Sequence, residues 1–199
     1  YILHIVDLDG KEVDKMKIMG LDTKKTSIPR PISTTLNRFI EDLLKGKDWK
    51  EISLQIVEYK KQLRNTTNIL DIGLPKGISD ADGYTKRFEA DQTIRLPGHV
   101  AAALHYNMML DKYNDKNSLR IRSGMKIKVF YLTENFGKFK SIALPTDTEI
   151  IPEWFVREFQ PRIDFDAHIE RLVDNPLKNI LKAIDKEVQR KKHLYRFTF

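Results

Sequence analysis

The spacing of apolar residues along the chain predicts several amphipathic helices. Apolar side chains recur at helical spacing over 36–44, and Gly46 is placed to end that helix. The same period continues over 49–64, so the short connection predicts an antiparallel helix pair. Pro97 is expected to open a further helix that runs to about Tyr113. The residues predicted to share one apolar face of that helix are Val100, Leu104 and Met108.

Segments rich in β-forming residues predict two hairpins. Residues 1–19 contain two such runs on either side of an Asp-Gly step that favours a turn, and the second run lies at 16–19. Further strands are expected over 125–132 and 141–144, with a turn that includes Gly137 between them.

The remaining segments complete the expected fold. Residues 20–31 contain two prolines and several small polar residues, which predicts an ordered loop. Residues 74–94 show no helical period and are predicted as a long loop of the functional or mobile kind. A helix is expected over 163–173, and a restart follows with Asn175 as its cap and Pro176 at its first position. The fold class is therefore α+β, mostly helical with a small antiparallel sheet, preceded by a β-hairpin.

Composition narrows the class of protein. The 199 residues are 41% hydrophobic and 32% charged, which is typical of a folded chain and not of a disordered one. The absence of cysteine suits a reducing compartment and excludes disulfides, thiolate metal sites and a cysteine nucleophile. Apolar runs are short, so no membrane partner is expected. The net charge of +7 favours a polyanionic partner such as nucleic acid.

Basic residues form two candidate phosphate-binding groups. The first combines cations, hydroxyls and backbone amides near a helix start, a combination that can hold a phosphate; its members are Lys24, Lys25, Thr26 and Ser27. The second mixes charge with one aromatic ring and could follow a nucleic-acid backbone; its members are Lys76, Tyr84, Lys86 and Arg87. A further basic stretch runs over 112–128. A solvated surface explains the two groups equally well.

No independent active site stands out in the sequence. It contains no P-loop, no dinucleotide-binding glycine motif, no zinc-protease motif and no nucleophile elbow. Asp164 and Asp166 lie at a predicted helix start, where acidic side chains favour the helix dipole. His99 and His105 share one helix at the wrong spacing for a common metal. We expect no catalytic residue, metal or cofactor in this chain.

The C-terminal heptapeptide, residues 193–199, is rich in aromatic side chains. Such side chains should not remain in water at an unprotected terminus. The segment either folds back onto its own domain or acts as a docking peptide, and composition weighs the two equally. Its apolar residues are Leu194, Tyr195, Phe197 and Phe199.

The first thirty residues carry a specific pattern. Tyr1 opens a strand, a hairpin follows, and the next segment reads Gly20-Leu21-Asp22-Thr23-Lys24-Lys25-Thr26-Ser27-Ile28-Pro29. This order resembles the end of the palm in family B DNA polymerases of T-even-type phages, where a Lys-Lys-x-Tyr strand precedes a similar loop. Pro97-Gly98-His99 is similar to a helix start in the thumb of that family. The sequence departs from the family at Ala101, where a basic residue is usual, and it lacks the Asp-Thr-Asp catalytic motif of the palm.

The resemblance implies three parts and two further DNA contacts. These parts are the C-terminal end of a palm over 1–30, a thumb domain over 31–192 and a clamp-binding tail over 193–199. The resemblance adds Tyr1 and His99 to the DNA-contacting residues. It assigns clamp binding to the apolar residues of the tail.

The function implied by the resemblance is that of a C-terminal subunit or fragment of a DNA-directed DNA polymerase, a nucleotidyltransferase, in a phage-infected bacterial cytoplasm. Its expected partners are primer–template DNA, a sliding clamp, and an N-terminal polymerase part that carries exonuclease, fingers and palm. The carboxylates that bind Mg²⁺ for phosphoryl transfer would lie in that palm. Two alternatives stay open: a stand-alone, sequence-nonspecific nucleic-acid-binding accessory protein, and a structural interaction module.

Overall fold

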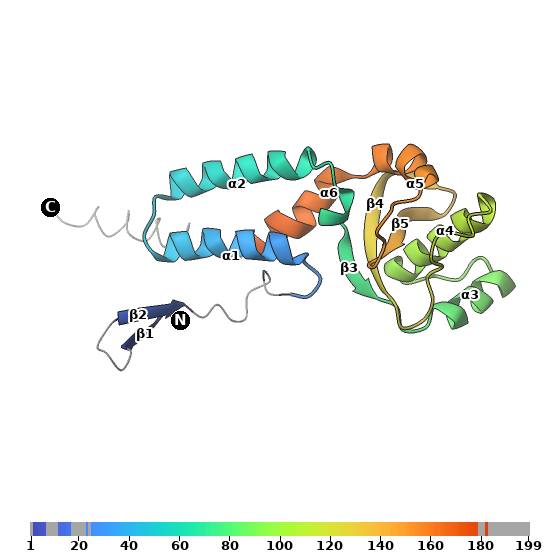
Figure 1. Ribbon diagram of the computed structural model, residues 1–199, viewed down its shortest axis with the longest axis horizontal. Helices are drawn as coiled ribbons and strands as arrows, with labels where there is room; N and C mark the ends of the chain where they lie inside the picture. Colours follow the sequence, from blue (N-terminus) through green and yellow to red (C-terminus); the bar gives the residue numbers. More distant parts are fainter. Residues whose placement is uncertain (1, 7–11, 17–22, 24, 179–181, 183–199) are drawn as a thin grey trace. The chain divides into compact units, whose positions relative to one another are not determined.

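A computed structural model describes residues 2–6, 12–16, 23, 25–178 and 182 (Figure 1). Within these residues, six α-helices accompany a three-stranded antiparallel sheet and a two-stranded hairpin, which confirms the α+β class. Contacts divide the chain into two compact units, residues 1–61 with 170–199 and residues 62–169. None of the described helices is long and apolar enough to cross a membrane.

The first unit begins with the expected hairpin. Strands β1 (Ile2–Val6) and β2 (Glu12–Met16) pair antiparallel, with the first residue of β1 opposite the last residue of β2. The second strand lies earlier than the predicted 16–19, of which only Met16 is among the described residues. Strand β2 contains only two apolar residues, Val13 and Met16, so it is defined by its pairing with β1 more than by its hydrophobicity.

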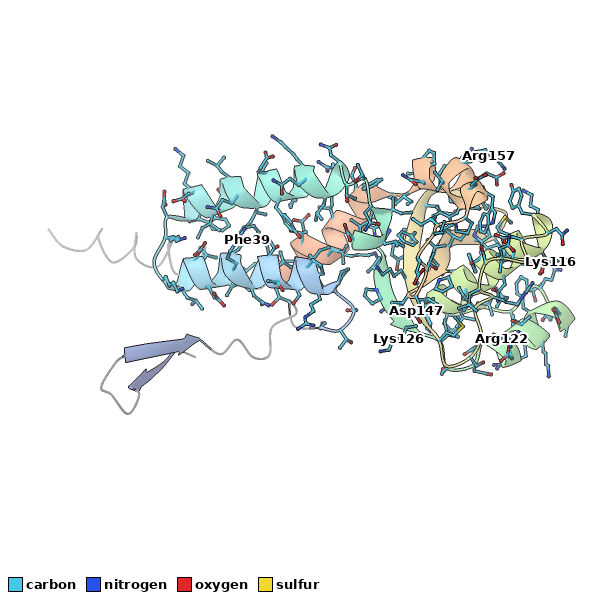
Figure 2. The ribbon with its side chains drawn as sticks, in the orientation of Figure 1. Phe39, Lys116, Arg122, Lys126, Asp147 and Arg157 are labelled. Atoms are coloured by element: carbon cyan, nitrogen blue, oxygen red, sulfur yellow. The ribbon has the colours of Figure 1, made fainter. Side chains whose placement is uncertain are left out.

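Two antiparallel helices form the body of the first unit. Helices α1 (Arg30–Leu44) and α2 (Trp49–Arg64) lie side by side (Figure 1). The buried ring of Phe39, labelled in Figure 2, meets the ring of Tyr59 edge to face at 6.0 Å between centroids. Gly46 adopts φ +82° directly after the C-cap of α1, which confirms its role in ending that helix.

The sequence predicts a helix break near Pro176, but the structure has a π-helical segment within a continuous helical stretch there. Helix α6 (Phe165–Ile169) leads into a π-helical segment, Glu170–Asp174, and α-helix resumes over 175–178. The predicted restart with Asn175 as an N-cap is therefore wrong, because Asn175 is itself helical. Proline has no N–H to donate to the preceding turn, and π-turns are one way in which a helix accommodates such an interruption.

The second unit is built on a three-stranded antiparallel sheet of order β3-β4-β5. Its strands are β3 (Leu74–Gly77), β4 (Lys126–Phe136) and β5 (Phe139–Pro145). The turn between β4 and β5 contains Gly137 at φ +59°, as the sequence predicts. Helix α4 (Gly98–Lys112) packs against this sheet, and α3 (Ala81–Ala90) and α5 (Glu153–Glu158) complete the unit.

The prediction of a long loop over 74–94 is wrong. This segment contains strand β3 and helix α3, which pack on β4 and α4. The Asp80 carboxylate caps α3 by accepting a hydrogen bond from the N–H of Gly83 at 3.1 Å, and Phe88 is buried. A four-residue strand and a short helix with few apolar residues give no clear period, so capping and tertiary packing define them.

Helix α4 is buried around more of its circumference than the sequence predicts. Val100 and Leu104 are buried as expected, but Met108 is 45% exposed, so its assignment to the core face is wrong. This helix contacts strands β4 and β5 and also helix α3. A small-residue pair, Ala102 and Ala103, allows the close approach that this burial requires.

Candidate nucleic-acid interface

A short loop before α1 presents a cation and hydroxyls to solvent. Lys25 and Thr26 are exposed and Ser27 is half-buried, whereas Ile28 and Pro29 are buried. The N–H of Ile28 donates to the carbonyl of Lys25 at 3.1 Å and closes a tight turn. This loop, residues 25–29, is called the phosphate loop below, since its composition suits an anionic oxygen.

The phosphate loop leads directly into the N-terminus of α1. The N-cap is Pro29, which makes no side-chain capping hydrogen bond, and no acidic residue lies in the first turn. The first N–H groups of a helix have no partner within it, and the helix dipole places partial positive charge there. Backbone amides, the dipole and the Lys25 ammonium therefore all favour an anion at this position.

A second helix start of the same kind lies in the other unit. Helix α4 begins after Pro97, again without a side-chain cap and without an acidic residue in its first turn. His99 is half-buried there, and it interacts electrostatically with Lys76 on β3. Burial, and then the Lys76 ammonium, lower the pKa of His99 below its usual value. At neutral pH, His99 is therefore a neutral hydrogen-bonding group next to an exposed cation.

The other three residues of the second candidate group, Tyr84, Lys86 and Arg87, lie on helix α3. Lys86 is exposed, but Arg87 pairs with Asp80 at 2.9 Å and donates to the carbonyl of Gly83 at 3.1 Å. The guanidinium also lies 4.2 Å from the centroid of the Tyr84 ring. Tyr84 and Arg87 thus hold each other on the helix surface, and a role for them in binding DNA stays a prediction.

Two exposed cations of the basic stretch 112–128, Arg122 and Lys126, were not among the predicted DNA contacts. Lys126 pairs in register with Gly77 at the end of the β3-β4 ladder, and Arg122 precedes the turn at Gly124 that leads into β4. Both are labelled in Figure 2 and belong to the basic stretch 112–128. Among the described residues, neither Arg122 nor Lys126 forms an ion pair. The pairing of β4 with β3, which the sequence did not predict, places Lys126 at the end of that ladder.

The two acidic residues at the predicted helix start, Asp164 and Asp166, have structural partners. The Asp164 carboxylate accepts from the N–H of Ala167 at 2.9 Å, which caps α6, and Asp166 binds Arg64. In the described part of the chain, no three His, Asp or Glu residues lie close enough to hold a metal ion together. The interpretation of Asp164 as a helix-start residue is confirmed.

Several predicted site residues lie outside the described residues. They are Tyr1, Lys24, Leu194, Tyr195, Phe197 and Phe199. Their roles, like the division into palm end, thumb and tail, stay predictions.

The chain is distantly similar to part of two phage DNA polymerases. No protein-family model matches it. It is 26% identical over 202 residues to a DNA-directed DNA polymerase of Escherichia phage RB69, an alignment that covers 98% of this chain and 21% of the relative. It is 24% identical over 199 residues to a DNA-directed DNA polymerase of Enterobacteria phage T4, with 98% and 21% covered. The chain is thus distantly homologous, along nearly its whole length, to about a fifth of these enzymes.

Proposed function

We propose that this chain is the C-terminal part of a family B DNA polymerase, the end of the palm and the thumb, and that it grips primer–template duplex. The similarity to two phage DNA polymerases over 98% of the chain carries this proposal. Two helix starts that lack acids and lie next to basic residues support it. The overall charge of +7 has the sign that a phosphate backbone requires.

In this proposal, the chain holds DNA through its phosphates. A phosphate oxygen at the start of α1 accepts from backbone N–H groups and from the Thr26 or Ser27 hydroxyl, while Lys25 supplies charge. A phosphate at the start of α4 meets Lys76 and the His99 imidazole in the same manner. Contacts of this type position a duplex without reading its sequence, as a polymerase that copies any template requires.

The remaining steps of replication are assigned to partners. A palm with paired carboxylates would hold the Mg²⁺ ions that phosphoryl transfer needs, and it would belong to the N-terminal polymerase part. The C-terminal heptapeptide would dock on a sliding clamp through a few aromatic anchors, as short peptides commonly bind. Added to a partner that carries this palm, the chain should restore tight primer–template binding and DNA synthesis.

Salt-dependent binding tests the DNA grip. Fluorescence anisotropy with a labelled primer–template would give the dissociation constant from 50 to 300 mM salt, and a plot of log K against log salt should slope by about −4 to −5 if roughly five phosphates are neutralised. Replacing Lys25 or Lys76 by Ala should each flatten the slope by about 0.9. Matched controls are K50A at the start of α2 and K116A just beyond the C-terminal end of α4, and neither should change the slope.

A wild-type slope near zero would contradict the proposed grip. So would equal effects of all four substitutions, since a diffuse basic surface would then explain the binding. Failure to restore synthesis in a palm-bearing partner, with DNA binding intact, would instead favour an accessory nucleic-acid-binding protein.

A further inference from the structure

Three polar side chains form a closed ring of hydrogen bonds beneath the phosphate loop. The Thr23 hydroxyl donates to Asn37 Oδ1 at 2.9 Å, Asn37 Nδ2 donates to Ser33 Oγ at 3.5 Å, and the Ser33 hydroxyl donates to the Thr23 carbonyl at 2.6 Å. Thr23 is 0% exposed and Asn37 is 8% exposed. Each hydroxyl hydrogen in the ring has one acceptor, so the donor directions are consistent all the way round.

This ring attaches the chain before the phosphate loop to the side of α1. Thr23 is held through both its hydroxyl and its backbone carbonyl, to two residues one turn apart on the helix. At the other end of the loop, Ile28 and Pro29 are buried and the turn is closed by a hydrogen bond to Lys25. The loop is therefore fixed at both ends, and its exposed side chains lie between the two attachments.

Simple stability does not require this arrangement. A buried threonine side chain could be replaced by valine of the same shape, and a buried asparagine by leucine, without any group left to satisfy. Buried polar side chains that are fully paired specify one geometry, because any displacement of the segment leaves donors unpaired in a dry environment. The geometry specified here is the distance of the loop from the N-terminus of α1.

We propose that Thr23, Ser33 and Asn37 are positioning residues for phosphate binding, an inference that rests on the proposed DNA grip. They hold the loop so that the Lys25 ammonium, the Thr26 and Ser27 hydroxyls and the N–H groups at the start of α1 reach one phosphate together. Pro31 has no N–H, and the Ser33 N–H donates to the Pro29 carbonyl. The N–H groups at that start are therefore those of Arg30 and Ile32. None of the three contacts the phosphate. When the ring opens, the loop keeps the same side chains, but they no longer reach the same phosphate.

A threonine series tests this role. T23V keeps the shape of the side chain and removes the hydroxyl, while T23S keeps the hydroxyl. Thr35 lies on the same helix, and its hydroxyl donates to the carbonyl of Pro31 one turn back and to no other described residue, so T35V is the matched control. The complete chain would be titrated with primer–template as above, well below the melting temperature of each variant.

The ring predicts a specific pattern of binding. T23V should flatten the salt slope by about one and weaken binding roughly threefold to tenfold, because one phosphate contact is lost. T23S should return both values to within about twofold of the wild type, and T35V should match the wild type. K25A should reduce DNA affinity much less in the T23V background than in the wild type, because a displaced Lys25 no longer contacts the phosphate. A change in stability alone would not produce this non-additivity.

The outcomes separate this inference from the function on which it rests. A wild type that binds DNA without salt dependence overturns the proposed grip. If the wild type shows the slope and K25A flattens it, while T23V changes neither slope nor affinity, the positioning role is wrong. Full additivity of T23V and K25A overturns it as well. If T23V does not fold, S33A opens the same ring at a half-buried position, and the same pattern is expected.

Discussion

Acidification should destabilise the second unit through His105. This residue is 1% exposed on α4, and its ring stacks on Phe139 with centroids 4.8 Å apart. Nδ1 lies 2.9 Å from the carbonyl oxygen of Ser141. A carbonyl can only accept, so Nδ1 carries the proton and donates it. Nε2 is buried without a hydrogen-bond partner among the described residues. A second proton would therefore sit on Nε2 in an apolar site with no acceptor.

The direction of the pH effect follows from the pKa of His105. Burial lowers this pKa below the value of about 6.5 that the residue has when unfolded, the hydrogen bond to Ser141 opposes the shift, and the Lys112 charge adds to it. Between the two pKa values the unfolded chain binds more protons than the folded chain. The free energy of unfolding should therefore be constant above the unfolded pKa and decrease as the pH falls through and below 6.5.

The size of the effect follows from the lack of an acceptor. A buried donor without a partner costs about 1–3 kcal/mol, and more when it is charged. For a chain of this size each kcal/mol changes the melting temperature by roughly 2–4 °C. A loss of about 2 kcal/mol between pH 7.5 and 5 thus corresponds to a decrease of roughly 4–8 °C.

Thermal unfolding followed by circular dichroism at these two pH values measures the difference. H105N is the informative variant, because its amide nitrogen can replace Nδ1 as the donor to Ser141 while the titrating group is lost. We expect H105N to be less stable at pH 7.5, since it leaves a cavity, but to lose distinctly less stability on acidification. H99N, at a half-buried position, is the control and should retain most of the wild-type pH dependence. Equal pH dependence in wild type and H105N would refute the reasoning.

Two further substitutions test how the elements that carry the interface are held. A β-carbon at Gly83 would lie 2.4 Å from the Asp80 carboxylate that caps α3, so G83A should lower the free energy of unfolding by about 1 kcal/mol or more. At Gly77 nothing lies within 4 Å of such a β-carbon, and a G77A variant with an equal loss in urea denaturation would contradict the assignment to the cap. D164A removes the N-cap of α6 and should lower the free energy of unfolding by about 1 kcal/mol. D164N keeps a capping oxygen, so it should retain most of the wild-type stability.

Long elements with a clear period could be predicted from the sequence. The predicted bounds of α2, 49–64, agree with the structure because sixteen residues give several repeats of its apolar positions. Helix α1 starts at Arg30, six residues before its predicted apolar face, because its first turn is specified by Pro29 and Pro31 and not by hydrophobicity. Short elements such as β3 and α3 depend on partners distant in sequence, and no local pattern indicates those partners.

Residue types that favour phosphate binding were visible in the sequence, but their arrangement was not. Lys25, Thr26 and Ser27 are adjacent in the chain, so their grouping could be predicted. The ring beneath them joins Thr23 to Asn37 across fourteen positions, and it is defined only when α1 and the loop are both in place. His99 and Lys76 come together for a similar reason, because β3 packs near the start of α4 only in the folded unit.

The distribution of acidic residues among the helix starts links these observations. Helices α2, α3, α5 and α6 each have an acidic residue in the first turn, which compensates the helix dipole with a charge of the chain itself. Of the six described α-helices, only α1 and α4 have none. Both follow a proline N-cap that makes no side-chain hydrogen bond, and both lie next to an exposed lysine. Under the proposed function, DNA phosphates would supply the missing negative charge and would stabilise two helix starts that the chain itself leaves without an acidic residue.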